Sequence, residues 1–186
     1  MDIPQACAGY VVGLMQSFML LEHMEGKKVL LCTGETFCRG NKEKQEPPYY
    51  RAPFGGDAAN ITIVENAGNE KVYYEFHQDG SQRKCLVIPD GAFRNPMTVE
   101  QIQNQIVRMP LTGVVMDGST VFNFAQKEVP ILVDSLTKMA ETTKEDIDWF
   151  LFHQPNKFML QKLAERIGVP FEKMPMDIVE KFGNSN

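Results

Sequence analysis

The strongest hydrophobic pattern of this chain lies close to its start. Apolar side chains recur at helical spacing, at Val11, Leu14, Met15 and Phe18. This period predicts a helix that begins near Ala6 and ends near Gly26, since glycine is favoured just beyond a helix C-terminus. Further apolar residues flank the stripe, so we expect the helix to be buried on almost all sides.

Short apolar runs bounded by turn residues predict the strands. These runs cover residues 27–34, 60–66, 71–76, 85–88 and 147–152. Their content of Val, Ile, Leu and aromatic residues is typical of strands. Because helical patterns alternate with these runs, we expect an α/β fold arranged in layers.

Two further helices complete the pattern. Residues 117–140 have a helical apolar face that starts at Asp117, a favourable N-cap, and contain Pro130, which should bend the helix. A later helix should have Pro155 in its first turn and end at Gly168. The remaining connections are a polar surface loop at 39–53 and an irregular stretch at 89–113 with a short helix near 98–107.

Composition limits the classes of protein to which this chain belongs. Its 186 residues, 43% hydrophobic and 23% charged, suit one globular domain or two small halves packed together. A net charge of −5 argues against nucleic acid or an anionic membrane as the main partner. No apolar run reaches the roughly 18 residues that a membrane-spanning helix needs.

The cysteines and histidines form no recognisable metal or disulfide pattern. The four cysteines are irregularly spaced and include no C-x-x-C pair. We therefore expect reduced thiols in a cytoplasmic protein, with neither a disulfide framework nor a zinc site. The three histidines are too far apart in sequence to indicate a metal site. Gly55 and Gly56 indicate a turn rather than a phosphate-binding loop, since no G-K-[ST] follows them.

Cys7 is a candidate nucleophile because of its place in the sequence. It stands where the first helix should begin, beside Ala6, Ala8 and Gly9, whose small size leaves space for a substrate carbonyl. The positive end of the helix macrodipole should favour its thiolate over its thiol. The alternative is an inert buried thiol, the commoner role of a free cysteine.

Three motifs follow one another along the chain. They are Ala6-Cys7-Ala8-Gly9, Trp149-Phe150-Leu151-Phe152-His153-Gln154-Pro155-Asn156 and Phe182-Gly183-Asn184-Ser185. Between them stand Gly55-Gly56-Asp57-Ala58-Ala59, His77-Gln78-Asp79-Gly80-Ser81 and Met116-Asp117-Gly118-Ser119-Thr120-Val121-Phe122. In this order the motifs resemble β-ketoacyl-acyl carrier protein synthase III of the thiolase superfamily. The resemblance covers nearly the whole chain and implies a thiolase-like layered α/β/α fold, incomplete in this chain.

The resemblance also implies an activity and the residues that carry it. Cys7 would accept an acyl group from acyl-CoA as a thioester. His153 and Asn184 would donate hydrogen bonds to the thioester carbonyl of malonyl-acyl carrier protein as carbon dioxide leaves. The carbanion would then attack the Cys7 thioester and give 3-oxoacyl-acyl carrier protein, an acyltransferase reaction of fatty acid biosynthesis. The resemblance implies no cofactor and no metal ion.

The carrier protein is acidic, so a net-negative enzyme needs a local basic patch to bind it. Lys157, Lys162 and Arg166 follow His153 and are candidates for that contact. A merely solvated helix face explains these charges equally well.

This chain departs from the family pattern in length and in two motif residues. Family members are longer, so we expect a fragment or trimmed form of a longer, homodimeric synthase. Residues 1–113 would be the remainder of the N-terminal half, and residues 114–186 the start of the C-terminal half. The turn at Gly56 lacks one family glycine, and Pro155 stands inside the histidine motif, which leaves the preferred acyl chain open.

Two other functions remain compatible with the sequence. The first is a related condensing enzyme of a specialised pathway. The second is a catalytically incompetent fragment, or a non-catalytic subunit with the thiolase fold, that only associates with partners. The presence of Cys7, His153 and Asn184 together favours a condensing enzyme.

Overall fold

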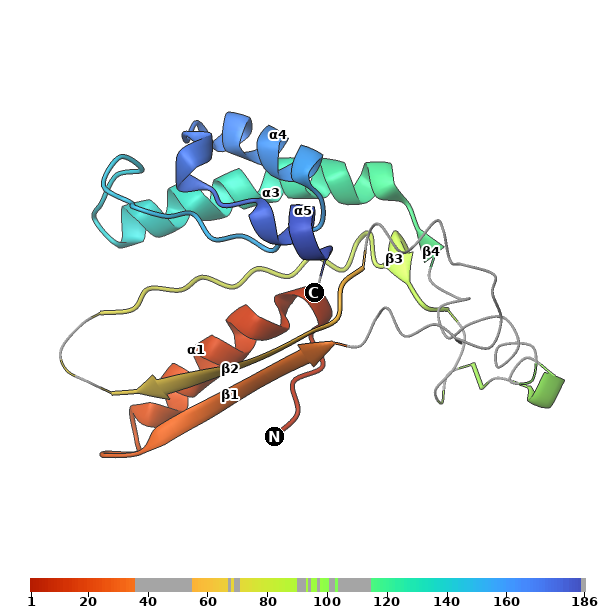
Figure 1. Cartoon of the computed structure of the whole chain (residues 1–186), viewed down its shortest axis with the longest axis horizontal. Helices are drawn as coiled ribbons and strands as arrows, with labels where there is room; N and C mark the ends of the chain where they lie inside the picture. Colours follow the sequence, from red (N-terminus) through yellow and green to blue (C-terminus); the bar gives the residue numbers. More distant parts are fainter. Residues whose placement is uncertain are drawn as a thin grey trace.

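The computed structural model of this chain describes residues 1–35, 55–66, 68, 71–89, 93, 95–96, 98–100, 103 and 115–184. Figure 1 shows its helices and strands along the chain. The predicted loop at 39–53 lies outside the described residues, and so does most of the predicted short helix near 98–107. Among the helices that the structure describes, none combines the length and the apolar character needed to cross a membrane.

The N-terminal part is an α-helix packed on a two-stranded sheet. Its elements are η1, a 3-10 helix (Ala6–Ala8), α1 (Gly9–Leu21), β1 (Lys28–Glu35) and β2 (Ala58–Glu65). The two strands are antiparallel, with Lys28 opposite Glu65 at one end and Glu35 opposite Ala58 at the other. Helix α1 lies along one face of this sheet (Figure 1). The strands predicted at 27–34 and 60–66 are therefore confirmed, with shifts of one or two residues.

Gly13 lets α1 lie close to the sheet. A Cβ atom at this position would be 2.7 Å from Cδ1 of Leu31, so a larger residue would require the Leu31 side chain to shift. Val12 and Leu21 of α1 are buried, and so is Val64 of β2. These contacts fix α1, and with it the preceding segment that carries Cys7, against the sheet.

The other side of α1 is exposed, which corrects the prediction that this helix is buried on almost all sides. Val11 is 66% exposed and Met19 is 49% exposed. The sheet contacts only one side of the helix, so the apolar residues of the other side stay in solvent. The helix also ends at Leu21 and not near Gly26. The chain turns there, because the N–H of Met24 bonds to the carbonyl of Leu21 and Gly26 has a φ of 64°.

The face of the sheet that points away from α1 is apolar and exposed. Leu30 is 61% exposed, Ile61 64% and Ile63 62%. Side chains alternate along a strand, so these residues lie opposite the face on which Leu31 contacts α1. Apolar residues on both faces are typical of a sheet that is covered on both sides.

The C-terminal part is a small strand pair followed by helices. Its elements are β3 (Leu86–Val87), β4 (Val115–Met116), α3 (Gly118–Met139), α4 (Lys157–Ile167), η2 (Phe171–Lys173) and α5 (Asp177–Phe182). β3 and β4 are antiparallel. The strand predicted at 85–88 and the helix predicted at 117–140 are confirmed. Helix α4 ends before Gly168 as predicted, but it begins after its N-cap Asn156, so Pro155 precedes the helix.

The main hydrophobic core of the C-terminal part lies around α4. Its buried members are Phe150, Leu160, Leu163, Ala164, Ile167, Val169 and Met174. Val129 and Val133 of α3 pack against this cluster. The core therefore holds together α3, α4 and the segment that leads into α4.

Two predicted strands, at 71–76 and 147–152, are not among the strands that the structure describes. In the second segment the side chains alternate as in a strand, with Phe150 6% exposed and Leu151 77% exposed. The N–H of Phe150 bonds to the carbonyl of Lys173, at 2.8 Å, instead of pairing with a strand. The predicted buried strand is therefore wrong at this segment, because strand pairing and burial both depend on distant segments.

Asp117 caps the N-terminus of α3. Its carboxylate accepts hydrogen bonds from the Ser119 hydroxyl at 2.6 Å, the Thr120 hydroxyl at 2.7 Å and the Thr120 backbone N–H at 3.1 Å. The bond from Ser119, followed by those from Thr120, lowers the pKa of Asp117 to about 2. The ionised carboxylate is therefore the form that the folded helix favours.

We expect the variant Asp117→Ala to melt at a lower temperature than the wild type at pH 7, since the cap is lost. Because the folded state lowers the pKa, the charge-dependent stabilisation is present above about pH 4 and is lost as the pH falls through about 2. Thermal unfolding followed by circular dichroism should show that the difference in melting temperature between wild type and variant narrows over that pH range. The matched control is Asp148→Ala at an exposed position. A difference in melting temperature that does not depend on pH would contradict the role of the Asp117 charge in capping α3.

Candidate functional site

Cys7 lies in η1, directly before α1, and not on the α-helix itself. The residue is exposed to solvent, but neighbouring protein atoms partly desolvate its sulfur. This desolvation raises the pKa of Cys7 above its ordinary value, and a hydrogen bond from its own backbone N–H offsets the effect only in part. The predicted preference for the thiolate is therefore wrong, and Cys7 is a thiol at neutral pH.

His153 lies in the segment between α3 and α4. Protein atoms on part of the imidazole desolvate it, and this lowers the pKa of His153 below its ordinary value. The ring is therefore neutral at pH 7, with one N–H as a hydrogen-bond donor. On either side the chain is fixed, because Phe150 is buried and the side chain of Asn156 accepts a bond from the N–H of Met159 at 2.8 Å.

Gln154 links the histidine segment to α5, a role that the sequence analysis did not assign. Its amide nitrogen donates to the carbonyl of Pro175 at 3.0 Å, and its amide oxygen accepts from the N–H of Val179 at 2.9 Å. Both partners lie in or just before α5. The signal for this role was the glutamine next to His153 in the motif, but its partners are more than 20 residues away.

Asn184 lies directly after Gly183, the C-cap residue of α5. The N–H of Gly56 donates to the carbonyl of Asn184 at 2.7 Å, and Gly55 and Asn184 form a parallel β-bridge. Gly183, between α5 and Asn184, has a φ of 80°. The backbone of Asn184 is thus held from one side by α5 and from the other by the turn that precedes β2.

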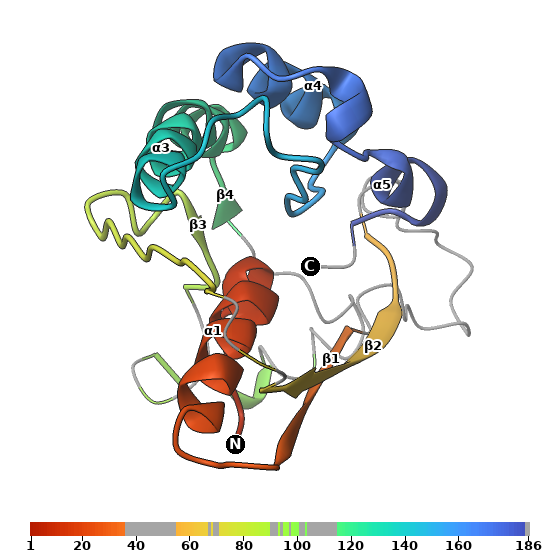
Figure 2. The ribbon, with the colours of Figure 1, turned by 90° about the vertical axis from the view of Figure 1, so that its left-hand side faces the viewer.

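The structure gathers the three segments that carry these residues around the middle of the molecule. In Figure 1 the N-terminal end of α1, the segment that enters α4 and the end of α5 lie close to one another. Figure 2 shows the same segments around the centre when the molecule is turned by 90°. Cys7, His153 and Asn184 therefore come from three separate places in the sequence to one region of the fold, and their catalytic roles stay a prediction.

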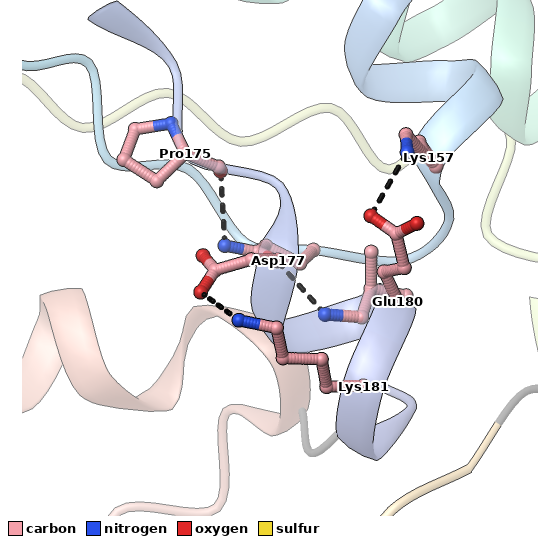
Figure 3. A network of polar contacts seen from close by, with 7 residues as sticks. Lys157, Pro175, Asp177, Glu180 and Lys181 are labelled. Atoms are coloured by element: carbon pink, nitrogen blue, oxygen red, sulfur yellow. Dashed lines mark hydrogen bonds and ion pairs between the residues drawn. The ribbon is translucent and has the colours of Figure 1, made fainter. Parts of the chain in front are cut away.

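The basic residues predicted to bind a carrier protein are partly neutralised. Lys157 pairs with Glu180 at 2.8 Å, and Lys162 pairs with Glu165 at 2.7 Å. Figure 3 shows the first of these pairs beside α5. Arg166 is exposed and forms no ion pair within the described residues. The patch is therefore less positive than its sequence indicated, and its role in carrier binding stays a prediction.

A metal centre finds no support in the described part of the chain. Within the residues that the structure places, no group of three or more His, Cys, Asp or Glu side chains could hold a metal ion. A shallow depression of ≈ 330 Å³ lies beside α4 and α5 and is lined by Lys157, Phe171 and Met174, among others. Its lining does not include Cys7, His153 or Asn184.

Comparisons with known proteins find similar sequences. Residues 137–186 match the family model described as 3-oxoacyl-[acyl-carrier-protein (ACP)] synthase III C terminal. The whole chain is 28% identical to a β-ketoacyl-[acyl-carrier-protein] synthase III of Synechocystis, and it covers 54% of that protein. The chain thus spans about half the length of the curated relatives it matches.

Solved structures show the same similarity in three dimensions. A crystal structure of a 3-oxoacyl-(acyl-carrier-protein) synthase III matches 96% of this chain and 54% of its own chain, with a TM-score of 0.77 and 30% identity. A 3-oxoacyl-(acyl carrier protein) synthase of Burkholderia xenovorans matches 96% of this chain and 50% of its own, with a TM-score of 0.73 and 30% identity. The chain is therefore similar in sequence to 3-oxoacyl-acyl carrier protein synthases III, and it has the α/β fold of these solved structures.

Proposed function

We propose that this chain carries the catalytic groups of an acyltransferase that condenses an acyl-CoA with malonyl-acyl carrier protein in fatty acid biosynthesis. The observation that carries this proposal is the bond from the N–H of Val179 to the Gln154 side chain. It ties the segment of His153 to α5, the helix that ends two residues before Asn184. This link between the two motifs supports the proposal that both side chains act on one substrate oxygen.

In the first step the Cys7 sulfur attacks the thioester carbonyl of acyl-CoA. A carbon–sulfur bond forms to Cys7, and the bond to the CoA sulfur breaks, so CoA leaves as a thiolate. Because desolvation raises the pKa of Cys7, its proton must leave during the attack, and the departing CoA thiolate can take it up. The acyl-Cys7 thioester is then the electrophile of the second step.

In the second step malonyl-acyl carrier protein loses carbon dioxide. The carbon–carbon bond to the carboxylate breaks, and its electron pair forms an enolate whose charge lies on the thioester oxygen. His153, kept neutral by its lowered pKa, and Asn184 donate hydrogen bonds to that oxygen. The enolate carbon attacks the acyl group, a new carbon–carbon bond forms, and Cys7 leaves as a thiolate that regains a proton.

The partners and the arrangement of the longer protein are further parts of this proposal. The acyl carrier protein would contact Lys157, Lys162 and Arg166 on α4. Residues 1–113 and 114–186 would belong to the N-terminal and C-terminal halves of the family fold, in a cytoplasmic homodimer. The match of residues 137–186 to the C-terminal family model supports this division.

The test is to incubate the folded wild-type chain with acyl-CoA species of increasing length and to measure the intact mass. We expect one acyl group per chain, found on the peptide that contains Cys7, because the proposal assigns the nucleophilic role to that sulfur. Adding malonyl-acyl carrier protein should discharge this group and yield 3-oxoacyl-acyl carrier protein. A folded chain that takes up no acyl group would contradict the proposal.

A non-catalytic role as a subunit is favoured by one observation. The apolar outer face of the β1–β2 sheet, with Leu30, Ile61 and Ile63, is suited to cover by another polypeptide. A chain with this role alone would associate with a partner and remain unacylated in the experiment above.

A further inference from the structure

The turn before β2 and the end of α5 are joined by backbone atoms. The N–H of Gly56 donates to the carbonyl of Asn184 at 2.7 Å, and Gly55 pairs with Asn184 in a parallel bridge. Gly55 and Gly56 are both buried. This contact joins residues of the N-terminal part to the end of the C-terminal part.

No side chain fits at either side of this contact. A Cβ atom on Gly56 would overlap the carbonyl oxygen of Phe182. A Cβ atom on Gly183 would lie 2.5 Å from the carbonyl oxygen of Gly55 and 2.8 Å from its carbonyl carbon. Gly183 also has a φ of 80° and a ψ of −178°, a conformation essentially limited to glycine. Gly56 on one segment and Gly183 on the other are therefore what permits the approach.

We propose that Gly55, Gly56 and Gly183, here called the glycine clamp, position the side chain of Asn184 for the decarboxylation step. This inference rests on the proposed function, in which Asn184 donates to the enolate oxygen. The clamp fixes the backbone from which that side chain projects. The glycines touch no substrate and act only through Asn184, so they are positioning residues.

The expected effect is large because a donor to a developing charge must be accurately placed. A displacement of about 1 Å in a reacting group costs roughly 10²-fold in rate. The overlap at Gly56 involves backbone atoms, which cannot rotate away as a flexible side chain would. A methyl group there must move the end of α5, and with it Asn184.

The test compares Gly56→Ala with the wild type in two half-reactions. Acylation of Cys7 by acyl-CoA should change by less than about threefold, whereas kcat for decarboxylation of malonyl-acyl carrier protein should fall about 10²-fold. KM should stay nearly constant, since substrate binding does not involve the clamp. The double variant Gly56→Ala/Asn184→Ala should be no slower than Asn184→Ala alone, because both changes remove the same donor. The matched control is Gly118→Ala, where nothing lies within 4 Å of a Cβ atom.

A second measurement tests the clamp without any activity. The side-chain amide signals of Asn184 in NMR spectra, assigned by their loss in Asn184→Ala, should shift in Gly56→Ala and stay in place in Gly118→Ala. Gly183→Ala should give the same shift of the amide signals. It replaces Gly56→Ala in this measurement if Gly56→Ala does not fold. Unchanged amide signals, or equal losses in both half-reactions, would overturn the clamp. A wild-type chain that catalyses neither half-reaction would overturn the proposed function. The NMR result alone would then show whether the glycine clamp positions the Asn184 side chain.

Discussion

Replacing Cys7 by alanine should abolish condensation, because it removes the sulfur to which the proposal assigns the acyl group. Removal of the nucleophile in covalent catalysis lowers the rate by about 10⁶-fold, which here means loss of all detectable product. The acyl adduct should also disappear from the intact mass. Decarboxylation of malonyl-acyl carrier protein should persist, since His153 and Asn184 remain in place.

Cys32→Ala is the matched control for this variant. Cys32 is also an exposed free thiol, but it lies on β1 and faces away from α1. Its replacement should leave the stoichiometry of acylation unchanged. Equal acylation of Cys7→Ala and the wild type would show that the acyl group sits elsewhere, and the role of Cys7 would then be wrong.

Replacing Leu160 by alanine should destabilise the chain by about 2–5 kcal/mol, the usual cost of a buried leucine. Leu160 is 1% exposed and lies in the core formed with Leu163, Ile167 and Phe150. The removed methyl groups leave a cavity that neighbours on α3 and α4 fill only in part. Because domains are stable by about 5–15 kcal/mol, this loss is a substantial fraction of the total.

Urea unfolding of the two proteins measures this difference. The control is Leu151→Ala, at a position that is 77% exposed, and it should change the free energy of unfolding by less than about 0.5 kcal/mol. A change below about 1 kcal/mol for Leu160→Ala would mean that the core around α4 is not closely packed.

Much of the fold was predictable because it depends on neighbours in the sequence. The strand at β1 and the helix α3 with its Asp117 cap follow from local periodicity and from a side chain that bonds three residues ahead. The segment at 147–152 shows the limit of this reasoning. It was predicted as a buried strand, but whether a strand forms depends on a partner elsewhere in the chain. The burial of α1 was overestimated for the same reason, since an apolar helix face does not reveal what covers it.

The residue types of the candidate site were predictable from the sequence. The protonation state of Cys7 and the contacts around the site were not. Cys7, His153 and Asn184 stand in motifs that the sequence displays, and the structure places their segments in one region (Figure 2). The protonation of Cys7 was not predictable, because desolvation by surrounding atoms outweighs the effect expected at a helix N-terminus. The contacts of Gln154 and Gly56 were also missed, since they join segments far apart in the chain.

The two bonds of the Gln154 side chain limit how related chains can vary in length. Adding or deleting one residue in α4 would rotate everything after it by about 100° relative to the preceding turn. Pro175 and Val179 would then no longer meet the Gln154 amide, and Asn184 would be carried away with α5. Evolutionary insertions and deletions are therefore expected outside residues 154–184, for example in the exposed turn at 78–82, where the chain can lengthen without moving either donor.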